Sequence, residues 1–99
     1  MKRRENDLMI EEVTFSKQGL KEYLYWQKED RKTLDKINKL ILDIQRNEHE
    51  GIGHPEPLKH DLTDKWSREI DKKNRLIYKI FEKENMFKIY QCKGHYSDK

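Results

Sequence analysis

The clearest structural signal in the sequence lies in residues 31–47, which read RKTLDKINKLILDIQRN. Apolar residues recur there at helical spacing, and charged residues occupy the opposite side. The members of this apolar stripe are Leu34, Ile37, Leu40, Ile41 and Ile44. The pattern predicts an amphipathic helix over residues 31–47, with one face packed against other elements of the fold.

The segment before this helix predicts a strand and a first helix. Residues 8–15 contain β-branched and aromatic residues typical of a short strand. Ser16 is a candidate N-cap for a helix that ends near Asp30. The residues at helical spacing in this first helix are Leu20, Tyr23, Leu24 and Gln27. Two consecutive helices of this kind are expected to pack antiparallel on a sheet.

The segment after the long helix predicts a loop and three strands. Residues 50–65 contain two glycines and two prolines, which favour a loop. Three apolar runs, at residues 66–70, 75–81 and 86–92, are separated by polar turns, as in an antiparallel meander. The predicted order β-α-α-β-β-β gives an α+β fold, with two antiparallel helices on one face of a twisted, mainly antiparallel sheet. The other face is then free to bind a partner.

Composition limits the classes of protein to consider. Of the 99 residues, 33% are hydrophobic and 41% are charged, a composition that favours disorder. The small net charge of +3 and the 10% aromatic content favour a folded single domain instead. The longest apolar run, residues 40–42, is too short to cross a membrane, and residues 1–7 lead into no signal-peptide stretch. A cytoplasmic protein without membrane association is expected, with residues 1–7 as a loose extension.

The positive charge is concentrated in the second half of the chain. Residues 1–53 carry 11 basic and 11 acidic side chains, whereas residues 54–99 carry 11 basic and 8 acidic ones. An anionic partner would therefore meet the C-terminal half first. A surplus of this size is also common on an ordinary protein surface.

Glu56 is the most unusual candidate for chemistry, because it lies between Pro55 and Pro57. A residue before proline is driven into an extended conformation, so this carboxylate is held on a stiff segment. A general base benefits from such fixed placement. The alternative interpretation is a solvated loop glutamate.

Other candidates lie in and after the predicted strands. Arg68 and Arg75 are candidates for holding a phosphate, since the planar guanidinium matches phosphate oxygens. The alternative interpretation of these two arginines is that they form surface ion pairs with Glu69 or Asp71. His95 can donate a proton near neutral pH, and Tyr96 can stack on a base or donate to a phosphate. In a chain terminus, such a pair often has no function.

Metal and thiol chemistry are not expected. His49, His54 and His60 lack the spacing of metal ligands, so the sequence predicts neither a metal site nor a cofactor. Cys92 is the only cysteine, which excludes an internal disulfide, and its place near the end of a strand favours a small buried apolar residue. Trp26 and Trp66 are expected to pack in or against the core.

Taken together, these residues resemble the YoeB toxins of the RelE/ParE superfamily. The resemblance runs from about residue 8 to residue 96, and its specificity lies in the order and spacing of several short motifs. These motifs are Tyr23-Leu24-Tyr25-Trp26-Gln27, Lys36-Ile37-Asn38, Pro55-Glu56-Pro57-Leu58-Lys59-His60, Trp66-Ser67-Arg68, Arg75-Leu76-Ile77-Tyr78 and His95-Tyr96.

The resemblance implies a single toxin domain over residues 8–96 that cuts messenger RNA on the ribosome and has a YefM-like antitoxin as partner, with a homodimer also possible. By position, Glu56 matches the family's general base and His95 its general acid. Arg75 matches the arginine that stabilises the phosphate, and Tyr96 the adjoining catalytic-site tyrosine. Two further basic residues match positions that hold RNA or stabilise charge, namely Lys59 and Arg68.

Three departures from the family pattern are visible. A short tail, residues 97–99, follows Tyr96, whereas the family's type member ends at the tyrosine. Glu69 stands where a second consecutive arginine is found, which weakens the local positive field. Gly94 replaces a bulkier residue, and this predicts a looser tail.

The residues suit metal-independent RNA cleavage. RNA carries its own nucleophile, the 2′-hydroxyl, so a base, a cation beside the phosphate and an acid suffice. Two alternatives remain open at this point. One is a non-catalytic inhibitor of the same fold, like the ParE toxins that act on gyrase, and the other is a plain RNA-binding domain.

Overall fold

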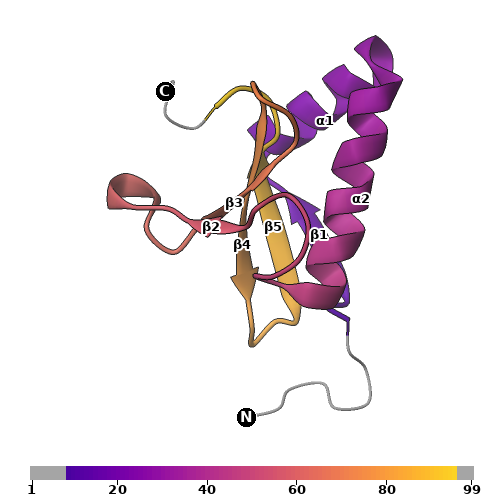
Figure 1. Ribbon diagram of the computed structural model, residues 1–99. Helices are drawn as coiled ribbons and strands as arrows, with labels where there is room; N and C mark the ends of the chain where they lie inside the picture. The colour runs from indigo at the N-terminus through magenta and orange to yellow at the C-terminus, as the bar shows by residue number, and fades with distance from the viewer. Residues whose placement is uncertain (1–8, 96–99) are drawn as a thin grey trace.

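A computed structural model describes residues 9–95 of the chain. Its elements, in chain order, are β1 (Glu12–Phe15), α1 (Lys17–Glu29), α2 (Arg31–Asn47), β2 (Glu56–Pro57), a 3-10 helix (His60–Leu62), β3 (Trp66–Glu69), β4 (Arg75–Phe81) and β5 (Met86–Gln91). Both helices lie on one side of the sheet, and the loop after β2 projects from the other side (Figure 1). The predicted α+β class and the placement of the helices are confirmed.

The sheet has the strand order β1-β5-β4-β3-β2. Strand β1 runs parallel to β5, whereas the β5–β4, β4–β3 and β3–β2 pairs are antiparallel. The predicted meander of three strands is confirmed as β3, β4 and β5. The prediction missed β2, a two-residue edge strand inside the breaker-rich loop, because prolines beside Glu56 argue against a strand. The first strand starts at Glu12, and Leu8 lies outside the described residues.

Side-chain caps define the two helices. The Ser16 hydroxyl accepts a hydrogen bond from the Gly19 amide at 2.9 Å, which confirms the predicted N-cap. Asp30 both ends α1 and begins α2, because its amide donates to the Trp26 carbonyl while its carboxylate accepts from the Thr33 amide. This shared residue produces a sharp reversal of the chain. As a result, the two helices pack on each other as well as on the sheet.

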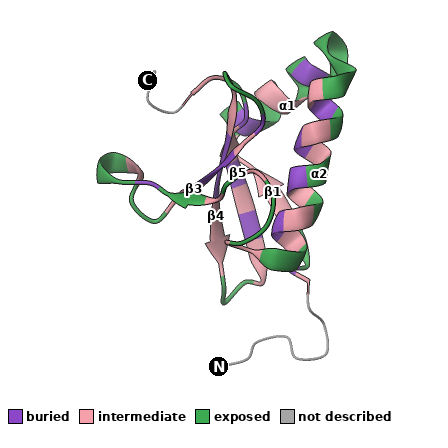
Figure 2. Ribbon diagram, in the orientation of Figure 1, coloured by how far each residue is buried: buried purple, intermediate pink, exposed green. Residues whose placement is uncertain are grey.

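The core lies between the helices and one face of the sheet (Figure 2). Four of the five residues in the predicted stripe of α2 are buried, and Ile41 packs against them from a half-buried position. Helix α1 differs from its prediction, since Leu20 and Leu24 are 45% and 50% exposed. It buries Trp26 and Gly19 instead. A side chain at position 19 would collide with the Ile89 carbonyl, so glycine lets α1 approach β5 closely.

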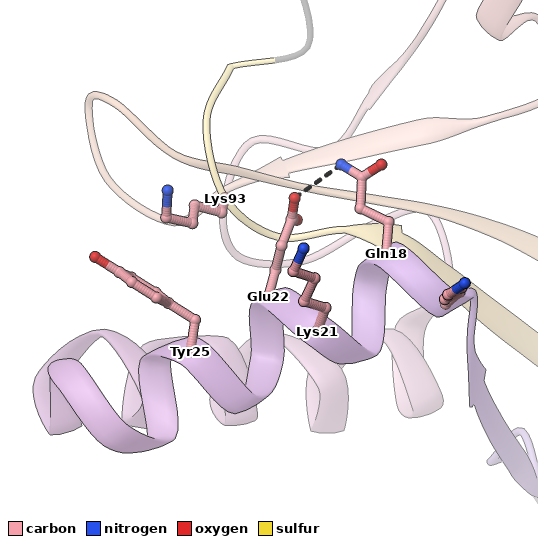
Figure 3. Close-up of a pocket in the computed structure, with 6 residues that line it drawn as sticks. Gln18, Lys21, Glu22, Tyr25 and Lys93 are labelled. Atoms are coloured by element: carbon pink, nitrogen blue, oxygen red, sulfur yellow. Dashed lines mark hydrogen bonds between the residues drawn. The ribbon is translucent and has the colours of Figure 1, made fainter.

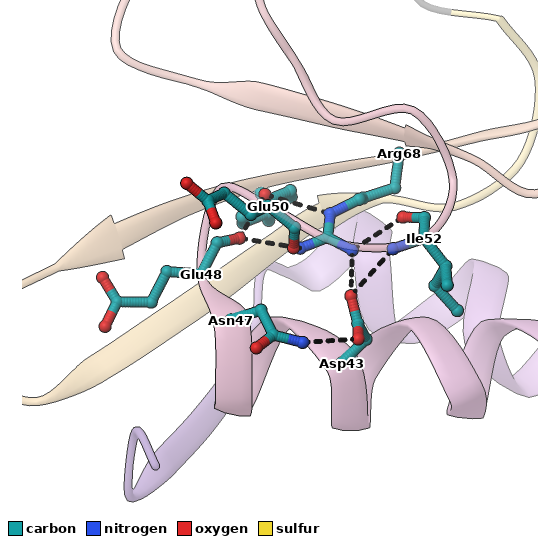
Figure 4. Close-up of polar contacts among 7 residues, drawn as sticks. Asp43, Asn47, Glu48, Glu50, Ile52 and Arg68 are labelled. Carbon is teal, nitrogen blue, oxygen red and sulfur yellow. Dashed lines mark hydrogen bonds and ion pairs between the residues drawn. The ribbon is translucent and has the colours of Figure 1, made fainter. Parts of the chain in front are cut away.

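Arg68 corrects one prediction of the sequence analysis. Its side chain is completely buried on the helix side of β3, so it cannot contact RNA in this fold. It pairs with Asp43 of α2 at 2.6 Å rather than with Glu69 or Asp71. It also donates to three carbonyl groups of the loop after α2 at 2.7–2.9 Å and to the Tyr78 hydroxyl at 3.2 Å (Figure 4). These carbonyls belong to Glu48, Glu50 and Ile52.

The Asp43 carboxylate is held in its ionised form by the same cluster. Burial alone would raise the pKa of Asp43, but hydrogen bonds from Arg68, Asn47 and the Ile52 amide lower it below its ordinary value. The cluster thus joins α2, β3 and the loop between them. Neither helix in residues 9–95 is long and apolar enough to span a membrane.

We expect Arg68→Ala to lower the free energy of unfolding by about 3–5 kcal/mol, since it leaves a carboxylate and several carbonyls without their donor. Arg46→Ala, which removes an exposed arginine, is the matched control and should change stability by less than about 0.5 kcal/mol. Urea unfolding followed by circular dichroism measures both. Equal stability of the two variants would contradict a structural role for Arg68.

Candidate active site

The sheet register places Glu56 and Arg75 on the same face of the sheet. Glu56 pairs with Ser67, Ser67 pairs with Ile77, and Arg75 lies two residues from Ile77 on β4. Paired residues share a face, as do residues two apart on a strand. Arg68 has the opposite parity and points into the helix-side cluster. Glu56 and Arg75 therefore lie on the face away from the helices.

Glu56 is exposed on the edge strand β2. The chain after it is anchored, because Leu58 is buried and its amide donates to the Lys65 carbonyl at 2.9 Å. Strands β2 and β4 are separated by β3 alone, which puts their backbones about 10 Å apart. A ribose and its phosphate fit between a carboxylate and a guanidinium at this separation. The stiff placement expected from the flanking prolines is consistent with this geometry.

The Arg75 side chain is oriented by the turn that precedes it. One guanidinium nitrogen, Nη1, donates to the Asp71 carbonyl at 2.6 Å and to the Asn74 carbonyl at 3.1 Å. Within the described residues, the other guanidinium nitrogens have no hydrogen-bond partner. They remain free to bind an anion.

The chain beside His95 is clamped to this turn. The Arg75 amide donates to the Gly94 carbonyl at 2.9 Å, and the Gly94 amide donates to the Asn74 side-chain oxygen at 2.7 Å. Gly94 has φ of +84°, and no atom lies within 4 Å of the place that a Cβ would occupy, so the backbone conformation rather than lack of space favours glycine. These bonds hold Gly94 itself, and the looser tail stays a prediction, since residues 96–99 lie outside the described residues. The same bonds bring His95 next to the start of β4.

Two more contacts hold Cys92, two residues before Gly94. Its carbonyl accepts from the Trp26 indole at 2.9 Å, and its amide donates to the Glu22 carboxylate at 2.7 Å. Its side chain is buried, as expected, and burial together with the Glu22 charge raises the pKa of the thiol to about 12. A thiol with this pKa is protonated at neutral pH and is no nucleophile.

No hydrogen bond or ion pair within residues 9–95 joins the remaining predicted residues to Glu56 or Arg75. Lys59 is exposed and precedes the 3-10 helix, and Tyr96 lies outside the described residues. Residues 1–7 and 97–99 are likewise outside them. Among the described residues, no group of His, Cys, Asp or Glu side chains has the arrangement of a metal site.

Asn74 and Asp71 are positioning residues that the sequence analysis missed. Asp71 accepts hydrogen bonds from the Lys73 and Asn74 amides at 2.8 and 2.7 Å and from the Asn74 side chain. Burial would raise the pKa of Asp71, but these hydrogen bonds and the Arg75 charge lower it. The available signal was the turn sequence itself, since Asp and Asn favour such side-chain-to-backbone turns.

Glu69 lies directly opposite Arg75 across the β3–β4 pair. Its carboxylate is 3.2 Å from the His54 ring, and the charge of Glu69 opposes the field of Arg75 on the same face. The family pattern has an arginine at position 69, so the replacement by glutamate lies directly beside Arg75, the candidate phosphate-binding residue.

Two helices packed on one face of a five-stranded sheet (Figure 1), in this order along the chain, are the architecture of the RelE-like class of bacterial toxins. Residues 15–96 match the family described as the YoeB-like toxin of bacterial type II toxin–antitoxin systems. The chain is 44% identical to the toxin YoeB of Streptomyces coelicolor over 84 residues, which cover 85% of this chain and 98% of that protein. The chain belongs to the YoeB-like toxin family.

Solved structures agree with this assignment. A YoeB dimer from Staphylococcus aureus is 44% identical and superposes with a TM-score of 0.80 over 88% of this chain and 99% of that one. A YoeB–YefM complex from the same organism is 45% identical, with a TM-score of 0.78 over 85% and 95% of the two chains.

Asn74→Ala should speed hydrogen exchange of the Gly94 amide about two- to tenfold, because it removes the acceptor of that amide. The Ser16 amide, which donates to the Ile89 carbonyl, is the internal control and should not change. Lys73→Ala is the matched variant, since its side chain is exposed in the same turn. An unchanged Gly94 rate in Asn74→Ala would contradict the clamp.

Proposed function

We propose that this protein is a ribosome-dependent endoribonuclease that cuts messenger RNA in the ribosomal A site and thereby inhibits translation. The observation that carries the proposal is the placement of Glu56 and Arg75 on one face of the sheet, with His95 held beside the start of β4. Acid, base and cation are the three groups that cleavage of RNA requires.

The reaction follows from these groups. Glu56 accepts the proton of the 2′-hydroxyl, and the 2′ oxygen attacks the adjacent phosphorus. Arg75 stabilises the charge that develops on the phosphate oxygens, with Lys59 as a further cation and Tyr96 as a neighbour of the acid. His95 donates a proton to the 5′ oxygen as the phosphorus–oxygen bond breaks. The products are a 2′,3′-cyclic phosphate and a 5′-hydroxyl, and the reaction uses no metal.

The ribosome supplies what this small domain lacks. A net charge of +3 gives weak affinity for free RNA, so a substrate already placed in the A site suits the protein. Translation occurs in the cytoplasm, which is therefore the proposed place of action. The alternatives are a non-catalytic inhibitor like ParE and a plain RNA-binding module. Neither requires the combination of Glu56, Arg75 and His95.

Glu56→Gln, Arg75→Ala and His95→Gln should each lower cleavage by about 10²-fold or more, while the folded fraction stays unchanged for Glu56→Gln because its side chain is exposed. Primer extension in a reconstituted translation system measures cleavage, with an untranslated message as control. Glu84→Gln, at another exposed glutamate, should cleave like the parent protein. Full cleavage by a folded Glu56→Gln variant would remove the base assignment.

We further propose that a YefM-like antitoxin inhibits this protein, since the YoeB of Staphylococcus aureus forms a complex with YefM. A segment that folds on binding can cover the catalytic face and the tail together. A homodimer is proposed on the same ground, from the dimer of that relative.

Hydrogen exchange of the toxin, free and bound to its antitoxin, tests this mode of inhibition. We expect exchange to change in residues 86–96, which include β5 and the chain after it. Changes confined to α1 and α2, with cleavage still blocked, would show instead that the antitoxin obstructs ribosome entry.

A further inference from the structure

Two adjoining hollows extend from His95 along helix α1. The first has a volume of about 660 Å³ and is lined by His95, Gly94, Lys93 and Tyr25, with two lysines of the turn before β4. The second has a volume of about 560 Å³ and is lined by Lys93 and Tyr25 again and by Lys17 and Lys21 of α1. Lys93 and Tyr25 line both hollows, so the two adjoin; together they are called the groove below, and its α1 half is drawn in Figure 3.

The groove is strongly basic. Five exposed lysines line it, namely Lys17, Lys21, Lys72, Lys73 and Lys93. None of them forms an ion pair within residues 9–95. Glu22 is the single carboxylate in the lining, and both of its oxygens are engaged, one by the Cys92 amide and one by the Gln18 side chain. The five lysines therefore outnumber the single carboxylate of the lining and leave a surplus of positive charge.

The groove also contains an aromatic surface at its midpoint. Tyr25 is 44% exposed, and the Lys93 ammonium lies 4.8 Å from the centre of its ring. Figure 3 shows the two side chains facing each other across the groove. An exposed ring with lysines on both sides suits a single strand of nucleic acid, because bases stack on the ring and phosphates bind the ammonium groups.

The direction of the strand follows from the roles of the catalytic groups. Across the sheet, Glu56 on β2 is followed by β3 and by Arg75 on β4, and β5, against which α1 packs, comes next. His95 follows β5, lies beside the start of β4 and lines a hollow with Tyr25 of α1, at the end of the sheet. The base acts on the ribose that lies 5′ of the scissile phosphate, whereas the acid acts on the 5′ oxygen of the nucleotide that follows it. A strand bound in this way enters at β2, crosses the face away from the helices and turns past His95, at the end of the sheet, into the groove.

We propose that this groove binds the messenger RNA nucleotides on the 3′ side of the cleaved bond, with Lys17 and Lys21 contacting the phosphates farthest from the catalytic groups. The proposal rests on the proposed function, since it takes the strand direction from the roles of Glu56 and His95. It assigns α1, which holds none of the proposed catalytic residues, a part in substrate binding.

The test uses two messages in the same reconstituted translation system, one that continues well beyond the cleavage position and one that ends directly after the next nucleotide. The test protein carries Lys17→Gln and Lys21→Gln together. Both lysines are exposed on α1, and neither lines the hollow that contains His95. The matched control is Lys28→Gln with Lys32→Gln, two exposed lysines that line neither hollow.

The parent protein and the control should cut the long message at least about fivefold faster than the short one, at equal and limiting enzyme concentration. The Lys17→Gln, Lys21→Gln protein should cut both messages at one rate, equal to that of the parent on the short message. Equal losses on both messages would mean that these lysines contact ribosomal RNA and would overturn the proposal, as would no loss on either. Absence of cleavage by the parent protein would instead contradict the proposed function itself.

Discussion

The guanidinium of Arg68 is buried between the sheet and α2, where its donors meet the Asp43 carboxylate, the Tyr78 hydroxyl and three backbone carbonyls of the loop after α2. That loop leads into Gly53, whose carbonyl accepts from the Glu69 amide at 2.6 Å, and then into β2. The position of Glu56 therefore depends on a charge cluster on the opposite face of the sheet. A buried ion pair adds little net stability but fixes one arrangement of the chain.

Because side chains alternate along β3 and β4, the residues that stabilise the fold lie on one face of the sheet and the proposed catalytic arginine lies on the other. Arg68 of β3 and Tyr78 of β4 are buried on the helix side. Ile77 and Arg75, which lie one and three residues before Tyr78, face the other side. The second anchor of the site is the turn before β4, where Asp71 holds Asn74 and Asn74 holds Gly94. Residues from β2, from β4 and from the chain after β5 are thus brought together by two small polar networks on an otherwise apolar framework.

Periodicity predicted α2 and the meander of β3 to β5, because α2 carries a regular apolar stripe and these strands are separated by polar turns, but it did not predict the edge strand β2. It did not predict which side chains of α1 are buried, since the close approach at Gly19 turns Trp26 rather than Leu20 and Leu24 toward the core. It also could not place Arg68, because local sequence does not reveal a carboxylate 25 residues away. Glu56, Arg75 and His95 were proposed from their residue types and from the family resemblance. Asn74, which has no reactive group, was missed.

The central claim is that the protein cuts RNA by using the substrate's own 2′-hydroxyl, with Glu56 and His95 as base and acid. A message carrying a single 2′-deoxynucleotide on the 5′ side of the cleaved bond tests this most directly, because it removes the nucleophile and leaves every other contact in place. The expected result in a reconstituted translation system is loss of cleavage at that bond, while the unmodified message is cut to a 2′,3′-cyclic phosphate and a 5′-hydroxyl. Cleavage of the modified message at the same bond would contradict the mechanism.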